Sequence, residues 1–220
     1  MQKDYDVGSN KALYGEVRSP YANPIASIVP AINRLRSSKR WARVVFTYDW
    51  LPAAMQRTFC RADSPGAALL DALDVQAGDV HFRKDNDDSF CTEGGVPEAS
   101  TKCNQLGAVL AALGHSPQEA SLVFAGQRFE RCMLKTVMHA RALGYECTIC
   151  RGATYAKEEA PDPEWNVPSA EAIQLIMGPA AASEAGAPPA WAKEVHTARK
   201  SAGSRLATDY LQAANVRIVE

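Results

Sequence analysis

The 220-residue sequence contains no apolar run that approaches the roughly 20 residues needed for a membrane-spanning helix. It also lacks an excess of charge of either sign, since its 24 Lys and Arg residues are nearly balanced by 25 Asp and Glu residues. Its basic residues are dispersed, and the densest group, between Arg34 and Arg43, falls at a predicted helix end where cations suit the helix dipole. We therefore expect a protein that binds neither a membrane nor nucleic acid.

The first residues lack the apolar run of a secretory signal peptide. In the absence of such a signal, we expect a cytoplasmic location and reduced thiols at the cysteines. There are six of them: Cys60, Cys91, Cys103, Cys132, Cys147 and Cys150. The hydrophobic content of 46% is that of an ordinary globular chain, and one domain over residues 1–220 is the expectation.

Short runs rich in β-branched and aromatic residues alternate with helical patterns along the chain. Strands are predicted at residues 42–48, 79–83, 121–125, 145–150 and 215–219. Helices are predicted from Asn23 onward, with Pro30 either kinking the helix or delaying its start, and at residues 65–73, 100–113, 129–143 and 190–213. This alternation predicts a three-layer, Rossmann-like α/β domain whose mostly parallel sheet is covered by helices on both faces. Proline-rich stretches near 157–168 and 178–189 are predicted insertions.

Several chemically competent side chains follow the predicted strands. Asp49 and Lys84 end two of them, and the turn from Gly126 leads to Cys132. Ligands of parallel α/β sheets bind at the carboxyl ends of the strands. Cys132 also comes at the start of a predicted helix, whose dipole lowers the pKa of a thiol and favours the reactive thiolate. The alternative is a buried structural cysteine packed on the sheet.

Cys147 and Cys150 have the spacing of a zinc or redox pair. They fall within a predicted strand, however, where residues three apart point to opposite faces. No second pair of this kind completes a zinc site, and the four histidines match no ligand spacing. We therefore expect two structural thiols.

Four motifs occur in an order that resembles the isochorismatase-like cysteine hydrolases. MQKDY resembles the family's Asp-x-Gln-x-Asp-Phe opening, and VVFTYDWLP resembles the strand and Asp-Trp-His-Pro motif of its nicotinamidases. CRADSPGAAL is similar to the His-Cys-x-x-x-Thr-Pro-Gly-Ala segment. The stretch from AGQRFERC to GYECTIC resembles the segment that carries the nucleophile.

The resemblance implies a role for each matching residue. Cys132 would attack an amide carbonyl to give a thioester, and Lys84 would stabilise the thiolate and the oxyanion. From the residues alone, Lys84 is better explained as a surface lysine among acidic neighbours. A cis peptide supporting the oxyanion hole would fall at Gln127 and Arg128. The substrate pocket would be lined by Tyr5 and Trp50. A small amide is the implied substrate, and a homo-oligomer is a further possibility.

The sequence departs from the family at the metal site. Of the metal ligands only Asp49 is retained, because Leu51, Met55 and Phe59 stand where the nicotinamidases have histidines. One carboxylate is a poor site for a transition metal, so we expect no metal and no other cofactor.

A second departure concerns the start of the chain. The family's catalytic Asp stands directly before the position of Met1, so that this Asp and the first strand are absent from the sequence. We expect Met1 to be internal to a longer product whose preceding strand ends in Asp. Without that base, attack by the thiol should slow by about 10²–10⁴-fold.

Two functions therefore remain open. One is a nicotinamidase-like, cysteine-dependent amidohydrolase. The other is a catalytically inactive protein that retains the isochorismatase fold for binding or assembly.

Overall fold

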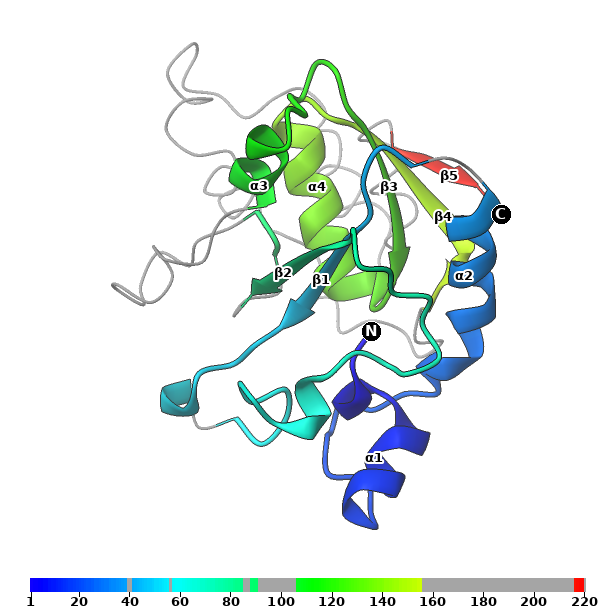
Figure 1. Ribbon diagram of the computed structural model, residues 1–220, viewed down its shortest axis with the longest axis vertical. Coiled ribbons are helices and arrows are strands. Elements are labelled where there is room, and N and C mark those ends of the chain that lie inside the picture. Colours follow the sequence, from blue (N-terminus) through cyan, green and yellow to red (C-terminus); the bar gives the residue numbers. More distant parts are fainter. Residues whose placement is uncertain (39–40, 56, 85–87, 91–105, 156–215, 220) are drawn as a thin grey trace, which may run out of the picture. The chain divides into compact units, whose positions relative to one another are not determined.

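The computed structural model describes residues 1–38, 41–55, 57–84, 88–90, 106–155 and 216–219 (Figure 1). The chain divides into two compact units, Met1–Leu106 and Gly107–Glu220, called here the N-terminal and C-terminal units. The predicted insertions near 157–168 and 178–189 and the predicted helix at 190–213 lie outside the described residues. The single-domain prediction stays a prediction.

The N-terminal unit contains a pair of parallel strands, β1 (Val45–Asp49) and β2 (Val80–Lys84). Both were predicted, and both are confirmed to within three residues at each end. The register pairs Val45 with Val80 at one end and Asp49 with Lys84 at the other. This register sets the carboxyl ends of the two strands side by side.

Two helices precede these strands. α1 (Val7–Tyr14) was not predicted; the Asp6 carboxylate caps it by accepting a hydrogen bond from the Ser9 backbone N–H at 2.8 Å. α2 (Val29–Ser38) follows a 3₁₀ turn at Ile25–Ile28. Pro30 is the second residue of α2, where a missing N–H costs nothing, and the predicted later start of this helix is confirmed.

The predicted helix at 65–73 is wrong. A 3₁₀ turn (Pro65–Ala67) is followed by Ala68 in an extended conformation, with φ −65° and ψ 150°. The segment is drawn out because it pairs with the start of the chain: the Ala68 carbonyl accepts from the Lys3 N–H at 2.9 Å, and the Leu70 N–H donates to Met1. These long-range bonds outweigh the helical preference of its alanines and leucines.

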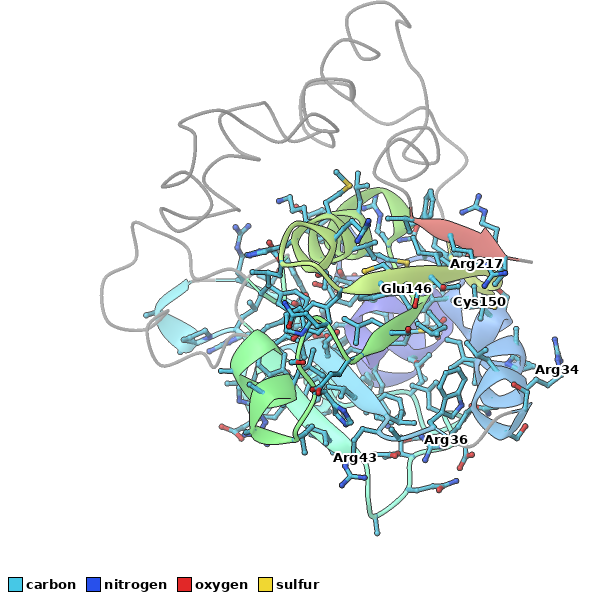
Figure 2. The ribbon with its side chains drawn as sticks, turned by 90° about the horizontal axis from the view of Figure 1, so that it is seen from above. Arg34, Arg36, Arg43, Glu146, Cys150 and Arg217 are labelled. Carbon is cyan, nitrogen blue, oxygen red and sulfur yellow. The ribbon has the colours of Figure 1, made fainter. Side chains whose placement is uncertain are left out.

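The arginines near the end of α2 differ in their surroundings. Arg34 is exposed and projects outward from the helix in Figure 2. Arg36 instead lies with its Nη2 2.8 Å from Asp79 and its Nε 3.1 Å from Asp74, so it ties α2 to the segment that leads into β2. The expectation of a solvated helix end is therefore confirmed for Arg34 and corrected for Arg36.

In its described part, the C-terminal unit contains three parallel strands in the order β3-β4-β5. Its elements are α3 (Leu106–Ala112, which begins at the boundary of the units), β3 (Ser121–Gly126), a π-helical turn (Phe129–Met133), α4 (Leu134–Ala142), β4 (Glu146–Thr154) and β5 (Arg217–Val219). The three predicted strands and the helical character of 129–143 are confirmed. Of the predicted helix at 100–113, only the part from Leu106 lies within the described residues.

α4 packs its apolar residues into the core of the C-terminal unit, where Val137 and Ala140 are fully buried together with Ile149 of β4. Among the described residues, all strand pairs are parallel, as predicted for an α/β fold. Among the described helices, none has both the length and the apolar character required to cross a bilayer.

Candidate active site

Asp49 and Lys84 form a buried ion pair at the ends of β1 and β2. Because the two residues are partners in the parallel register, their side chains leave the same face of the sheet. Asp49 is 6% exposed and Lys84 is 7% exposed. The Lys84 ammonium donates to Asp49 Oδ1. The predicted catalytic lysine is therefore paired with Asp49, the one residue that matches a metal ligand of the nicotinamidases. The expectation of a surface lysine is wrong.

Tyr5 completes this arrangement from the 3₁₀ turn Lys3–Tyr5. Its hydroxyl donates to Asp49 Oδ2, so each carboxylate oxygen accepts one hydrogen bond. The Tyr5 ring packs against Phe59, with 5.9 Å between the ring centroids. Tyr5 was predicted as a pocket residue; in this unit it is part of the polar cluster formed by Tyr5, Asp49 and Lys84, called here the Asp49 cluster.

Gln2 fixes the backbone on which Asp49 sits. Its side-chain nitrogen donates to the carbonyls of Asp49, at 2.5 Å, and Ala67, at 2.8 Å. Its side-chain oxygen accepts from the Asp49 N–H at 2.8 Å. The carboxamide thus pairs with both backbone groups of Asp49, as a neighbouring strand would. Sequence reasoning gave Gln2 no role.

Asp4 anchors the loop beside this cluster. Its carboxylate, on a residue only 2% exposed, accepts the Cys60 backbone N–H at 2.7 Å and holds Cys60 at a φ of +49°. Asn10 donates to the Asp4 backbone carbonyl at 3.1 Å. Gly66 lies against the same carboxylate, because a Cβ added there would meet the Asp4 side chain at 2.1 Å. No role was predicted for Asp4, because its partner Cys60 is 56 residues away in the sequence.

The residues around Asp49 do not fit a transition metal. Leu51 and Phe59, which replace histidines by the resemblance, are buried in one apolar cluster with Cys60, against which Tyr5 and Tyr21 pack. Both Asp49 oxygens already accept hydrogen bonds. Within the described ranges, no group of three His, Cys, Asp or Glu side chains is gathered as a metal site would require.

Trp50, the other predicted pocket residue, follows β1 directly and is half-buried. Its backbone N–H donates to the Lys84 carbonyl at 2.7 Å. The Arg83 guanidinium lies 4.1 Å from the centroid of its ring in a cation–π contact. A pocket role for Trp50 stays a prediction.

Cys132 lies in the C-terminal unit, on the π-helical turn Phe129–Met133 that leads directly into α4. The chain leaves β3 at Gly126, whose φ of +121° suits glycine. The next peptide, between Gln127 and Arg128, is cis, as the resemblance predicted. The turn is closed by a hydrogen bond from the Phe129 N–H to the Tyr155 carbonyl at 3.0 Å. Helical structure thus begins three residues before Cys132 rather than at or after it.

Two buried polar atoms beside this turn have no hydrogen-bond partner: Gln127 Oε1 and Arg151 Nη1. The Arg151 guanidinium, on β4, lies 4.6 Å from the centroid of the Phe129 ring. Buried polar atoms are normally paired, so these two mark the turn as an incompletely satisfied part of the C-terminal unit. The oxyanion role of Gln127 and Arg128 stays a prediction.

The described cysteines differ in accessibility. Cys132 is half-buried, whereas Cys60, Cys147 and Cys150 are buried. Burial raises the pKa of the Cys147 thiol to about 12. Burial, reinforced by the charges of Asp49 and Asp4, raises the pKa of Cys60 further. At neutral pH both thiols are therefore protonated and poorly nucleophilic.

The family model described as the Isochorismatase domain matches residues 11–166. A comparison with curated protein sequences gave no match.

Several solved structures share the fold. PnC1 from L. infantum in complex with nicotinate is 19% identical with a TM-score of 0.60, over 100% of this chain and 88% of that one. An isochorismatase family protein from Desulfovibrio vulgaris is 15% identical with a TM-score of 0.59, over 100% and 89%. The pyrazinamidase of Pyrococcus horikoshii in complex with zinc is 15% identical with a TM-score of 0.55, over 100% and 94%. These likenesses show the predicted Rossmann-like α/β fold.

Proposed function

The chain belongs to the isochorismatase domain family, and from this premise we propose that it is a cysteine-dependent amidohydrolase that acts on a small amide. The observation that carries the proposal is the placement of Cys132. Among the described cysteines it is the one that is not buried, and it stands on the helical turn after β3. A thiol in that position has both the access and the helical environment that a nucleophile needs.

The proposed reaction has two steps. The Cys132 sulfur bonds to the amide carbonyl carbon, the C–N bond breaks, and ammonia leaves with the proton that the thiol has lost. Water then attacks the thioester, giving the free carboxylic acid and restoring the thiol. Peptide N–H groups of the turn at Gln127 and Arg128 are the proposed donors to the oxyanion.

Lys84 is the proposed cation of this reaction. Its burial and its ion pair with Asp49 support the role, because they hold one ammonium in a fixed place with low solvent screening. Lys84 and Cys132 belong to different units, and their joint action rests on the family resemblance.

The proposed substrate is a small amide that is not held through a metal-bound ring nitrogen. The apolar side chains of Leu51 and Phe59 support this choice, since neither can ligate an ion. Two structural neighbours, a pyrazinamidase and a protein bound to nicotinate, suggest the first compounds for a test.

The test is ammonia release by the purified chain from a panel of nicotinamide, pyrazinamide and aliphatic primary amides. Turnover of at least one amide, abolished by Cys132→Ala and retained by the control variant Cys150→Ala, is the expected result. Release that persists in Cys132→Ala would overturn the assignment of the nucleophile.

Alkylation separates the proposal from the inactive alternative. Iodoacetamide at pH 7 should modify Cys132 far faster than Cys60 or Cys147, whose raised pKa values keep them protonated. Equal rates at the three thiols, together with no turnover across the panel, would favour a protein that keeps the fold for binding or assembly.

A further inference from the structure

Asp49 is a buried carboxylate at the end of β1, and both of its oxygens accept hydrogen bonds. It is 6% exposed, it faces the Lys84 ammonium through one oxygen, and it accepts from Tyr5 through the other. Its backbone N–H and carbonyl are both held by Gln2. Neither its side chain nor its main chain is thus free to turn without breaking a buried hydrogen bond.

This arrangement has a direct consequence for Lys84. A buried ammonium is strongly disfavoured unless a carboxylate and further hydrogen bonds compensate for its lost hydration. Lysine is also a flexible side chain with three rotatable donors, so its place is set by the partner that it meets. The rigid carboxylate therefore helps to fix both the charge and the location of the Lys84 nitrogen.

The side chains at the positions of the missing histidines are apolar. Leu51 and Phe59 offer no ligand atoms, and Phe59 packs edge-on against Tyr21 with 5.0 Å between the ring centroids. A carboxylate with apolar neighbours and a lysine partner suits an ammonium rather than a dication, which would have to displace that lysine.

We propose that Asp49 is a positioning residue for Lys84, oriented by Tyr5 and Gln2, and that in this chain it performs this task instead of ligating a metal. The inference rests on the proposed function, in which Lys84 supplies positive charge to the reaction of Cys132. Asp49 itself need not touch the substrate.

The test is a mutant cycle that reads out the rate of Cys132 alkylation by iodoacetamide in the full chain. Lys84→Met should lower the rate about 10-fold, the effect of raising the thiol pKa by about one unit. Asp49→Asn should lower it in the same direction. The double variant should be no slower than Lys84→Met alone, because a residue that acts through Lys84 has no effect once that lysine is gone.

Two further variants make the cycle specific. Asp71→Asn removes the partner of the exposed pair Lys3–Asp71, where Asp71 is 87% exposed, and should leave the rate unchanged. Tyr5→Phe removes one hydroxyl and keeps the ring, and should lower the rate by about 3-fold or less, in the presence of Lys84 only. Tyr5→Phe also serves as the informative variant if Asp49→Asn does not fold.

For any amide that is turned over, Asp49→Asn should lower kcat while KM changes little.

Metal content gives a readout independent of activity. The purified chain, incubated with Zn²⁺ and desalted, should retain no stoichiometric zinc. Stoichiometric zinc that is lost in Asp49→Asn would overturn the proposal, as would effects of Asp49→Asn and Lys84→Met that multiply in the double variant.

The inference and the proposed function fail in different ways. If Lys84→Met slows alkylation while Asp49→Asn and Tyr5→Phe do not, the positioning role is wrong and the role of Lys84 stands. If Lys84→Met has no effect on alkylation and no amide is turned over, the proposed function itself is wrong, and the positioning role falls with it.

Discussion

At the ends of β1 and β2 the side chains of Asp49 and Lys84 are paired within the N-terminal unit, whereas in the C-terminal unit one buried polar atom directly after β3 and one on β4 have no partner. Asp49 accepts from Lys84 and Tyr5, and Gln2 satisfies the backbone beneath it. In the C-terminal unit, Gln127 Oε1 and Arg151 Nη1 are buried without hydrogen bonds.

The difference concerns these two places and not the units as wholes, because the N-terminal unit also buries Arg36 Nη1 without a hydrogen bond. The Asp49 cluster keeps ionisable groups buried because each has a partner of opposite charge or a hydrogen-bond donor. Each unit also buries a thiol that stays neutral: Cys60 in the N-terminal unit and Cys147, whose pKa is raised to about 12, in the C-terminal unit. Removing one member of the Asp49 cluster should therefore lower the free energy of unfolding markedly. Removing Gln127 Oε1, which has no partner, should change it little.

The largest expected effect comes from breaking the buried ion pair. Lys84→Met leaves the Asp49 carboxylate buried with Tyr5 as its remaining side-chain donor, and should lower the free energy of unfolding by about 3–5 kcal/mol. Urea unfolding followed by circular dichroism measures this loss. Lys3→Met, which breaks the pair with Asp71, whose side chain is 87% exposed, is the control and should cost at most about 1 kcal/mol. Equal losses in the two variants would contradict the claim that burial decides the difference.

A second large effect is expected at Gly66. Its substitution by Ala places a Cβ on the Asp4 carboxylate, which cannot move away without losing the Cys60 N–H. We expect a loss of about 1–3 kcal/mol, typical of overpacking. Gly78→Ala is the matched control, since nothing lies within 4 Å of its added Cβ. A thermal unfolding midpoint for Gly66→Ala as high as that of Gly78→Ala would show that the loop adapts freely.

These long-range contacts also mark the limit of what the sequence could predict. The five strands were found because short apolar runs bounded by turn residues carry a local signal, and Lys84 and Asp49 were placed correctly at strand ends. Gln2 and Asp49 are 47 residues apart, and Asp4 and Cys60 are 56 apart. No local sequence pattern predicts such pairs. The extended segment after Ala67 was predicted as a helix because its hydrogen bonds to Met1 and Lys3 are similarly distant in the sequence.

The C-terminal unit shows a different limit. The position of Cys132 could be predicted from its place between a strand and a helix, and the cis peptide at Gln127 from the family resemblance. That the helix opens with a π-helical turn at Phe129 could not be predicted, because Phe129 donates a hydrogen bond to Tyr155, a residue 26 positions later that directly follows β4. α1 was overlooked because its polar residues give little apolar periodicity.

The neutral thiol of the C-terminal unit predicts a pH effect. Because burial raises the pKa of Cys147 from 9.0 to about 12, the folded state keeps a proton that the unfolded state loses. Stability from this group is thus fully present below pH 9 and is lost progressively between pH 9 and 12. By pH 10 the loss should reach about 1 kcal/mol relative to pH 7.

The measurement compares urea unfolding at pH 7 and pH 10 in each protein. Cys147→Ala should show a drop in stability that is about 1 kcal/mol smaller than that of the unmodified chain. Val137→Ala removes a fully buried side chain that does not titrate, and its drop should match that of the unmodified chain. A drop in Cys147→Ala as large as in Val137→Ala would show that the thiol is not kept neutral by burial.

The smallest expected effect is at the unpaired glutamine, and it tests the comparison most directly. Gln127→Met removes a buried oxygen that has no donor and keeps a side chain of similar length, so no hydrogen bond is lost. The free energy of unfolding should stay within about 0.5 kcal/mol of the unmodified value or rise, since a buried atom without a partner costs free energy. Gln2→Met makes the same chemical change where the carboxamide holds Asp49 and Ala67, and should cost about 1–3 kcal/mol for the groups left unpaired. If Gln127→Met destabilises the chain as much as Gln2→Met does, then Gln127 has a partner in solution and the two strand ends do not differ in the way proposed here.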